Sequence, residues 1–467
     1  MKKNALMRLA AMFMTLTLLL TMGCNVNINI NDKGDKAVPA DEETAEKNGS
    51  ENGDEGADEQ LSVDTSVMKP WINSNILGLV TDDVTADLKD DYYLNVNHDY
   101  LRDAKLRPGY ATEAPFIEAM DIVEERCFDI LNDKSISGRD AQMVQDYYEM
   151  YLDWDARNEV GVEPFKPFAE AIRAVDSLDA MTDFMLSDIC FKFGSDLNSF
   201  SVGPNSDDSS LYELDLLPSP LSLGDSAEYS KLTENGKRKK EYNDGVYSYM
   251  LGRVGFNEDE IADILDAMYD FEKKLAAFEM TALEKSDPDS LKKRINPVTM
   301  DDLREMSPDY PYAEYFEKRG FGDSKLINLQ QPEWLKGLNS LYNDDNLEGI
   351  RAYLLARSLG KYISQVDEKA YRKQQELYNA YCGITESMPD EEEAYLETRS
   401  LFADNMARIY VDKYLTEEMR DEIRQLCQDA ADTYKVMLDD NDWLSDETKE
   451  QAKYKLEHIT INALYPD

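Results

Sequence analysis

The chain has 467 residues, of which 95 are Asp or Glu and 50 are Lys or Arg, so its net charge at pH 7 is −45. This charge argues against nucleic acid as a partner, because phosphate binding requires a basic surface. It indicates a strongly solvated surface or, alternatively, a preference for cationic peptides. With 42% hydrophobic residues, the chain can bury a large core and form two or three domains.

Residues 1–23 have the pattern of an export signal. Lys2, Lys3 and Arg8 form a positive start, and an apolar run follows over residues 9–22. This run is too short and wrongly flanked for a stable transmembrane helix. We therefore predict that residues 1–23 direct export.

The signal ends in Leu-Thr-Met-Gly-Cys, which resembles a bacterial lipobox. The resemblance implies cleavage before Cys24 and a lipid on its thiol, so that the protein would be anchored at the cell membrane outside the cytoplasm. Thr21 departs from the usual aliphatic residue at its position. The alternative is an ordinary secretory signal with an incidental cysteine.

Residues 24–69 are rich in Asp, Glu, Asn and Gly and have almost no aromatic side chains. Such a segment cannot bury enough apolar surface to offset its chain entropy. We predict an acidic, disordered tether, followed by a folded part over residues 70–467.

Helical patterns dominate the folded part. Residues 141–155 place an apolar and aromatic stripe on one helix face, and such stripes belong to a core. The stripe consists of Val144, Tyr147, Tyr148, Tyr151 and Leu152. Thr299 and Asp302 have the spacing of a capping box at the start of a helix. Further helices are predicted over residues 347–362, 392–414 and 416–438.

One segment has a β pattern instead. Residues 200–203 and 211–216 flank a turn at residues 207–210, and the second run alternates apolar and polar side chains. This alternation is typical of a half-solvated hairpin strand. The predicted fold is therefore mainly α-helical, with one small β-hairpin.

Glu272 is the glutamate of the predicted helix at residues 269–276, and taken in isolation it could be a catalytic carboxylate. A solvated or salt-bridged position on the helix face is the simpler interpretation. In so acidic a chain, the spacing of other carboxylate pairs carries no information.

The sequence lacks the motifs of common active sites. Its two histidines, His98 and His458, are far apart, and H-E-x-x-H does not occur, so the helical pair of zinc ligands is missing. G-x-S-x-G, a phosphate-binding glycine loop and a nucleotide fingerprint are also missing. We predict no catalytic residue and no metal ligand in this chain.

Five cysteines are present, and none belongs to a C-x-x-C motif. Apart from Cys24, they are Cys127, Cys190, Cys382 and Cys427. These four could pair in an exported protein, or they could be buried free thiols.

The last segment, residues 441–467, predicts a helix and then an extended run. Ser445 is a good N-cap, with Asp446 and Glu447 in the first turn. A stripe at 3–4-residue spacing predicts one buried face on this helix. The stripe consists of Thr448, Ala452, Leu456 and Ile459. The extended apolar run ends in Tyr-Pro-Asp at residues 465–467.

The same segment carries a family resemblance. Residues 443–456 match W-L-S-x-E-T-K-x-x-A-x-x-K-L and precede Y-P-D, an order that resembles the neprilysin-type (M13) zinc metallopeptidases. Residues 90–97, 296–303 and 406–414 resemble further family motifs in the same order. The resemblance covers roughly residues 90–467, and agreement at many points makes it specific.

The resemblance implies the helical lid lobe of such a peptidase, plus the first elements of its catalytic lobe. In the family, the two lobes enclose a cavity that admits only peptides, and zinc is held by H-E-x-x-H and a later glutamate. Because those motifs are missing here, this chain alone is expected to bind no zinc and to be inactive. An arginine that grips the substrate's end is also replaced: Phe116 matches its neighbour, but Thr112 stands in its place.

Two hypotheses follow. The chain is the N-terminal, truncated portion of a membrane-anchored zinc metalloendopeptidase acting on peptides, or it is a non-catalytic surface lipoprotein that binds peptides or a partner chain. The first predicts exposed apolar surface at residues 90–103 and 443–467. Asn462 and Ala463 resemble a substrate-binding motif of the family, but the adjacent Y-P-D places them elsewhere, and no substrate role is assigned to them.

Overall fold

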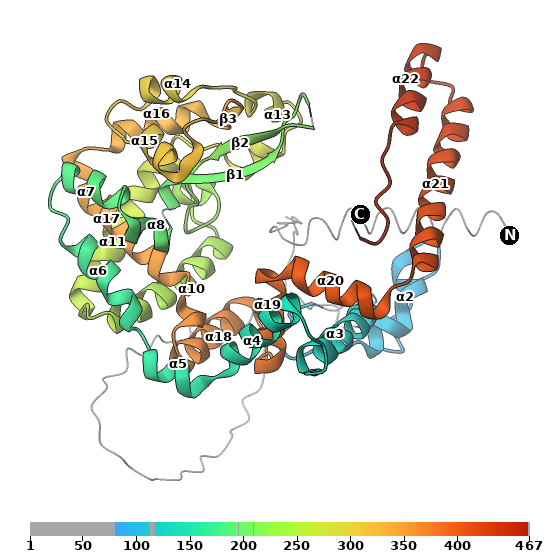
Figure 1. Cartoon of the computed structure of the whole chain (residues 1–467), viewed down its shortest axis with the longest axis horizontal. Helices are drawn as coiled ribbons and strands as arrows, with labels where there is room; N and C mark the ends of the chain where they lie inside the picture. Colours follow the sequence, from blue (N-terminus) through green and yellow to red (C-terminus); the bar gives the residue numbers. More distant parts are fainter. Residues whose placement is uncertain (1–79, 113–116, 195, 209, 466–467) are drawn as a thin grey trace, which may run out of the picture. The chain divides into compact units, whose positions relative to one another are not determined.

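The computed structural model describes residues 80–112, 117–194, 196–208 and 210–465 (Figure 1). The chain divides into two compact units, Gln60–Met406 and a unit that includes Ala407–Asp467. The predicted export signal, Cys24 and the tether lie outside the described residues, as do Phe116 and the last two residues of Y-P-D.

The first unit is mostly helical, as predicted. It contains α2 (Tyr92–Asp103), α3 (Ile117–Asn132), α4 (Arg139–Leu152), α5 (Trp154–Val160), α6 (Lys166–Arg173), α7 (Leu178–Met185), α8 (Asp188–Phe193), β1 (Ser199–Pro204), β2 (Tyr212–Leu217), α9 (Ser226–Ser230), α10 (Glu234–Arg253), α11 (Glu258–Ala276), α12 (Ala282–Ser286), α13 (Ser290–Lys293), α14 (Met300–Met306), α15 (Tyr312–Phe316), β3 (Ile327–Leu329), α16 (Pro332–Leu341), α17 (Leu347–Gly360), α18 (Glu368–Cys382) and α19 (Asp390–Leu401). Helix α20 (Ala403–Tyr414) spans the boundary, and the second unit contains α21 (Glu417–Asp439) and α22 (Asp446–Glu457).

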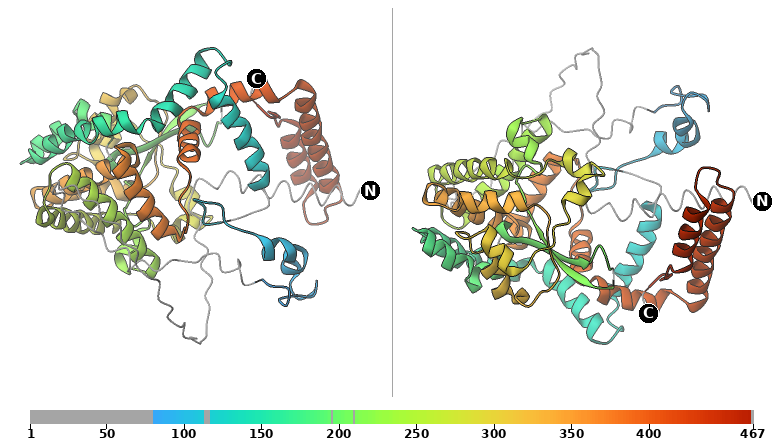
Figure 2. Two further views of the ribbon diagram at one scale, coloured as in Figure 1. Left: turned by 90° about the horizontal axis from the view of Figure 1, so that it is seen from below. Right: turned by 90° about the horizontal axis from the view of Figure 1, so that it is seen from above.

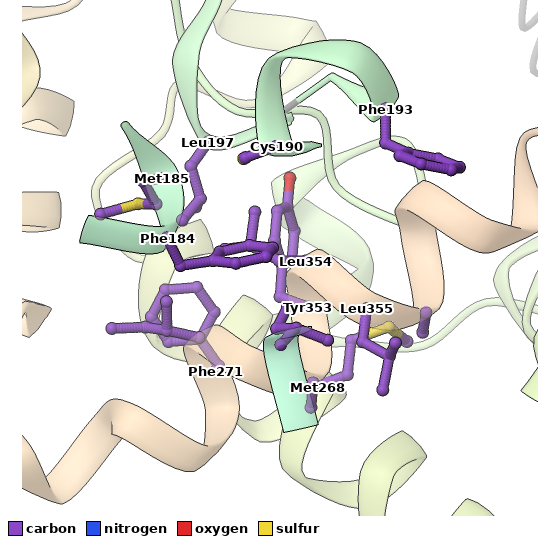
Figure 3. Close-up of a cluster of buried hydrophobic side chains, with 14 of the residues drawn as sticks. Phe184, Met185, Cys190, Phe193, Leu197, Met268, Phe271, Tyr353, Leu354 and Leu355 are labelled. Carbon is purple, nitrogen blue, oxygen red and sulfur yellow. The ribbon is translucent and has the colours of Figure 1, made fainter. Parts of the chain in front are cut away.

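Helices α11 and α17 form the centre of the first unit. Helix α17 is buried on nearly every side, which is typical of a helix surrounded by other elements. Figure 3 shows Met268 and Phe271 of α11 among the side chains that pack around Tyr353, Leu354 and Leu355 of α17. These aromatic and aliphatic side chains supply the main apolar burial that holds the unit together.

A glycine allows α17 to approach α11 closely. A Cβ atom built on Gly349 would lie 2.7 Å from the Cβ atom of Phe271 and 3.1 Å from the backbone oxygen of Ala267. The second of these atoms is backbone and cannot rotate away. The close packing of the two helices therefore depends on the missing side chain.

The predicted hairpin is confirmed, and a third strand accompanies it. Strands β1 and β2 are antiparallel, and β3 pairs with β2 in parallel, in the order β1-β2-β3. The side chain of Asn328 in β3 donates to Asp215 of β2 over 2.8 Å. With three residues, β3 is too short to show a recognisable alternation in the sequence.

Two predicted helices are interrupted. The predicted helix 141–155 ends at Leu152, and the carboxylate of Asp153 caps α5 by accepting from the backbone of Ala156 over 3.0 Å. The predicted helix 392–414 breaks at Phe402, whose ring packs edge-on against Tyr147 at 5.4 Å between centroids. Local capping and one tertiary ring contact outweigh the periodic pattern.

The predicted caps and core stripe are largely confirmed. Val144, Tyr148 and Tyr151 are buried on α4. Thr299 and Asp302 form the predicted capping box at the start of α14.

The second unit is a helical hairpin, in which α21 and α22 run side by side (Figure 2). Ser445 caps α22 as predicted, and Lys453 forms an ion pair with Asp439 over 2.5 Å. The expected buried face of α22 is wrong: Thr448 and Ile459 are exposed, while Ala452 and Leu456 are half-buried. Within the described part of this unit, α22 packs mainly on one neighbour, so its stripe is only partly covered.

The run after α22 folds back along α21. The Tyr465 hydroxyl donates to Glu417 over 2.8 Å, and the Arg420 guanidinium lies 4.4 Å from the centre of the Tyr465 ring. The run forms no strand over residues 459–465, since a strand needs a pairing partner. None of the helices in the described ranges is both long and apolar enough to cross a membrane.

Replacing Gly349 with Ala should lower the free energy of unfolding by about 1–2 kcal/mol. Overpacking costs about 1–3 kcal/mol, and the better helix propensity of Ala returns up to about 1 kcal/mol. Gly203→Ala is the control, because its added methyl group meets nothing within 4 Å. Urea denaturation measures both variants, and equal stability of the two would contradict the close-packing argument.

Candidate functional site

A buried carboxylate organises the most polar part of the first unit. Glu272 of α11 is 0% exposed. Its Oε1 atom accepts from the backbone N–H of Ser222 over 3.0 Å and from the Ser222 hydroxyl over 2.7 Å. Its Oε2 atom accepts from the Tyr229 hydroxyl over 2.5 Å. Arg357 of α17 lies 3.8 Å from Oε1 and donates to the Ser222 hydroxyl over 2.9 Å.

These partners come from three separate elements. Ser222 lies in the loop between β2 and α9, Tyr229 in α9, and Arg357 in α17. The loop turns at Gly224, whose φ of +87° favours glycine. The Glu272 carboxylate therefore joins this loop to the two central helices.

Burial raises the pKa of Glu272, and Arg357 and the hydrogen bonds from Tyr229 and Ser222 oppose that rise. Burial and the adjacent carboxylate also raise the pKa of Tyr229, so its hydroxyl stays protonated and donates. Both Glu272 oxygens are occupied and shielded from solvent, so the carboxylate cannot reach a substrate. Of the expected solvated or salt-bridged position, only the salt-bridged one describes Glu272, which is buried beside Arg357 and has a structural role.

A pocket of about 550 Å³ adjoins this network. Its lining residues are Leu217, Pro218, Ser219, Pro220, Leu221, Ser222, Gly224, Lys239, Asn243, Tyr247, Glu279, Lys285, Arg294, Gln330, Gln331 and Arg357. They come from the β2–α9 loop, α10, the segments around α12 and α13, the segment after β3, and α17. No motif in the sequence points to this pocket, because its polar residues lie in five separate segments.

The histidines do not form a metal site. His98 Nε2 lies 3.1 Å from the carbonyl oxygen of Thr81, and His458 Nδ1 lies 2.7 Å from that of Tyr454. Across the residues that the structure describes, no group of three or more His, Cys, Asp or Glu side chains could hold a metal ion. These residues therefore do not fit a zinc ion.

The four cysteines of the described part are free thiols. Cys127 and Cys190 are buried, and Cys382 and Cys427 are partly exposed. Burial raises the pKa of Cys190 to about 12 and also raises the pKa values of Cys127 and Cys382. Of the two alternatives for these cysteines, disulfide pairing and free thiols, the structure shows free thiols.

The segments with the clearest family motifs expose aromatic side chains. Tyr92 and Tyr93 of α2 are 68% and 60% exposed, and Trp443 is 78% exposed. Exposed apolar surface was expected in both segments. Thr112, which stands where the family has an arginine, is exposed.

Comparisons with known proteins identify the family of this chain. The sequence model described as peptidase family M13 matches residues 88–466. A protein named neutral endopeptidase from Lactobacillus helveticus is 21% identical over 400 residues, covering 82% of this chain and 60% of the relative. A neutral endopeptidase from Lactococcus lactis subsp. cremoris is 23% identical over 405 residues, covering 81% of this chain and 60% of the relative. The match thus spans less than two thirds of the length of each.

Solved structures share the fold. PepO from Lactobacillus rhamnosis HN001 superposes with a TM-score of 0.71 and 18% identity, covering 80% of this chain and 59% of that one. The zinc metalloprotease Zmp1 of Mycobacterium tuberculosis superposes with a TM-score of 0.69 and 20% identity, covering 82% of this chain and 57% of that one.

Replacing Glu272 with Ala should lower the free energy of unfolding by about 3–5 kcal/mol, because Arg357 and three donors lose their acceptor in a buried place. Glu272→Gln should cost less, because its amide oxygen still accepts from Ser222. Asp270→Asn, exposed on the same helix, should stay within about 0.5 kcal/mol of the parent. A loss for Glu272→Ala as small as for Asp270→Asn would contradict the role assigned to the network.

The same variants should differ in their response to pH. Because the native pKa of Glu272 is raised, the folded state holds this proton more tightly than the unfolded chain. Its contribution to stability is complete below the ordinary value of 4.5 and is lost as pH rises through the native value. The stability of the parent should therefore fall relative to Glu272→Gln as pH rises from 4.5. Urea denaturation across this range measures the difference, and a pH-independent difference would contradict the shift.

In a Cys24→Ser chain, an aromatic disulfide reagent should titrate four thiols after denaturation without reductant. In the native state, Cys427 and Cys382 should react first, and buried Cys190 should react only on unfolding. Cys190→Ser should remove that slow thiol alone. Fewer than four thiols in the denatured chain would indicate a disulfide instead.

Proposed function

The chain belongs to peptidase family M13, and on that premise we propose that residues 70–467 are the substrate-screening helical region of a neprilysin-like zinc metalloendopeptidase that acts on peptides. The observation that carries the proposal is the family match over residues 88–466. The shared fold with PepO supports it.

The proposed role is steric, and it suits the packing of the first unit. Screening by size needs a wall that keeps its shape, and the buried α11–α17 core supplies rigid, close-packed elements. Screening by size requires no nucleophile and no general base from this region. The screened substrates would be peptides small enough to pass the wall.

Zinc chemistry would have to come from other polypeptide. A bound zinc ion lowers the pKa of its water and so generates the nucleophile of this reaction class. The described residues do not fit zinc, and the sequence has no H-E-x-x-H. We therefore assign the zinc ligands to a portion outside residues 1–467, and no catalytic residue to this chain.

Exposed aromatic surface suits contact with such a portion. Leaving Tyr92, Tyr93 and Trp443 in water forgoes the free energy of burying large apolar side chains. Each of these residues lies in a segment with a family motif. Covering each of these side chains with further polypeptide would recover that free energy.

The proposed location is the outer side of a bacterial cell membrane. Export by residues 1–23 and a lipid on Cys24 would anchor the chain there, as the lipobox resemblance implies. A flexible tether over residues 24–69 would allow a reach on the order of 40 Å. Its negative charge would keep it away from an anionic membrane surface.

The second candidate is a non-catalytic surface lipoprotein that binds peptides or a partner chain. The missing H-E-x-x-H motif favours it. In that case the exposed aromatic side chains would serve binding alone. The following experiment separates the two candidates.

A chain lacking residues 1–23, with Cys24→Ser, should bind no zinc and cleave no peptide alone. Mixed with a separately produced polypeptide that carries the H-E-x-x-H portion of an M13 peptidase, it should form a complex that binds zinc and hydrolyses peptides. Zinc analysis and a fluorogenic peptide assay measure both. Peptide binding without turnover in the mixture would favour the second candidate, and zinc-dependent hydrolysis by the chain alone would contradict the absence of catalytic residues.

Trp443→Ser should weaken assembly of that complex at least about tenfold, which corresponds to about 1.4 kcal/mol. Tyr212→Ser is the matched control, because Tyr212 is 71% exposed but lies on β2, outside the exposed motif segments. Equal affinity of both variants would contradict a role for Trp443 in assembly.

A further inference from the structure

Cationic side chains gather in the pocket beside Glu272. Lys239, Lys285, Arg294 and Arg357 line it, and Glu279 is the single carboxylate among its lining residues. In a chain with a net charge of −45, this is a local reversal of sign. Such a reversal needs a cause, because like charges gathered in one place repel each other.

Two of the four cations are neutralised by the protein itself. Lys285 Nζ lies 2.6 Å from Glu279 Oε1. Arg357 donates to Ser222 and lies 3.8 Å from the buried Glu272 carboxylate. The carboxylates of Glu279 and Glu272 are therefore already paired with these two cations.

Lys239 and Arg294 are not neutralised in this way. Among the described residues, no carboxylate pairs with Lys239, and its Nζ atom would lie 2.8 Å from a Cβ atom built on Gly224. The pKa of Lys239 is lowered by burial and by the charge of Arg357. Arg294 Nε is shielded from solvent and has no hydrogen-bond partner in the described part of the chain. Leaving such groups unpaired is costly.

Neutral donors complete the lining. The side-chain oxygen of Gln331 accepts from the backbone N–H of Met280 over 2.8 Å, which leaves its NH₂ group free to donate. Gln330 also lines the pocket. Cations and amide donors are the groups that bind carboxylate and phosphate oxygens.

The size of the pocket narrows the ligand further. About 550 Å³ lies within the range of small-molecule sites and is much larger than one inorganic anion. The two unpaired cations match two negative charges. We propose that this pocket binds a small dianionic molecule through its carboxylate or phosphate groups, with Lys239 and Arg294 as the charged contacts.

This proposal is independent of the proposed peptidase function. It requires no zinc and no second polypeptide, because all the residues that it uses lie in the first unit. Binding would neutralise Lys239 and Arg294 and so stabilise the β2–α9 loop against α10. Failure of one proposal therefore leaves the other standing.

Calorimetric titration of the Cys24→Ser chain with inorganic phosphate and with succinate, at low ionic strength, tests the site. We expect saturable binding of at least one of them, and the tighter one identifies phosphate or carboxylate as the preferred group. Lys239→Met should weaken binding at least about tenfold, as loss of one desolvated ion pair does. Lys237→Met is the matched control on the same helix, because Lys237 is exposed and pairs with Glu234 over 2.6 Å.

Thermal unfolding provides a second readout. Without anion, Lys239→Met should melt no lower than the parent, because it removes a half-buried unpaired charge. The ligand should raise the melting temperature of the parent and of Lys237→Met, but not that of Lys239→Met. Arg294→Gln should behave like Lys239→Met, which keeps the test valid if one variant folds poorly. Absence of binding at millimolar phosphate and succinate, or equal affinity of Lys239→Met and the parent, would overturn the proposal.

Discussion

The buried Glu272 carboxylate is the interaction on which the arrangement of the first unit depends. Placing a carboxylate in a position with no solvent contact is costly unless donors surround it. Here the donors come from the loop after β2, from α9 and, at longer range, from α17. The burial of Glu272 therefore constrains the position of the loop, because the loop cannot move away from α11 without leaving the carboxylate unpaired. Removing the whole carboxyl group, as in Glu272→Ala, would release this constraint rather than merely weaken one contact.

The same constraint determines the electrostatics of the neighbouring pocket. Because Arg357 is held between Ser222 and Glu272, its charge is fixed at the pocket wall. That fixed charge contributes to lowering the pKa of Lys239. The surrounding acidic surface is screened beyond about 10 Å at ordinary ionic strength, so the pocket's local charge decides what enters it. A net charge of −45 and an anion-binding pocket are therefore compatible.

Much of the fold could be predicted from the sequence, because it is determined locally. The α4 stripe, the β1–β2 hairpin and the caps at Thr299 and Ser445 follow from periodicity and capping chemistry. The break at Phe402, the strand β3 and the partly covered face of α22 depend on tertiary neighbours, which a local pattern does not specify. For the polar site, Glu272 could be singled out, but its partners Ser222 and Arg357 are distant in sequence. The cations of the pocket carry no motif at all, since their meaning arises only when the fold brings them together.

The segments that carry family motifs differ in whether their side chains make contacts within the described chain. This difference bears on the proposed two-part architecture. The segment at residues 296–303 is used within the unit: Asn296 accepts from the backbone of Leu329, and Thr299 caps α14. By contrast, Tyr92, Tyr93 and Trp443 leave most of their surface in water. Large aromatic side chains contribute little to stability when exposed, so they serve the fold of this region poorly. The proposed contact with further polypeptide would explain both their type and their exposure, whereas a self-contained binding protein would have to maintain them as a solvent-exposed binding surface.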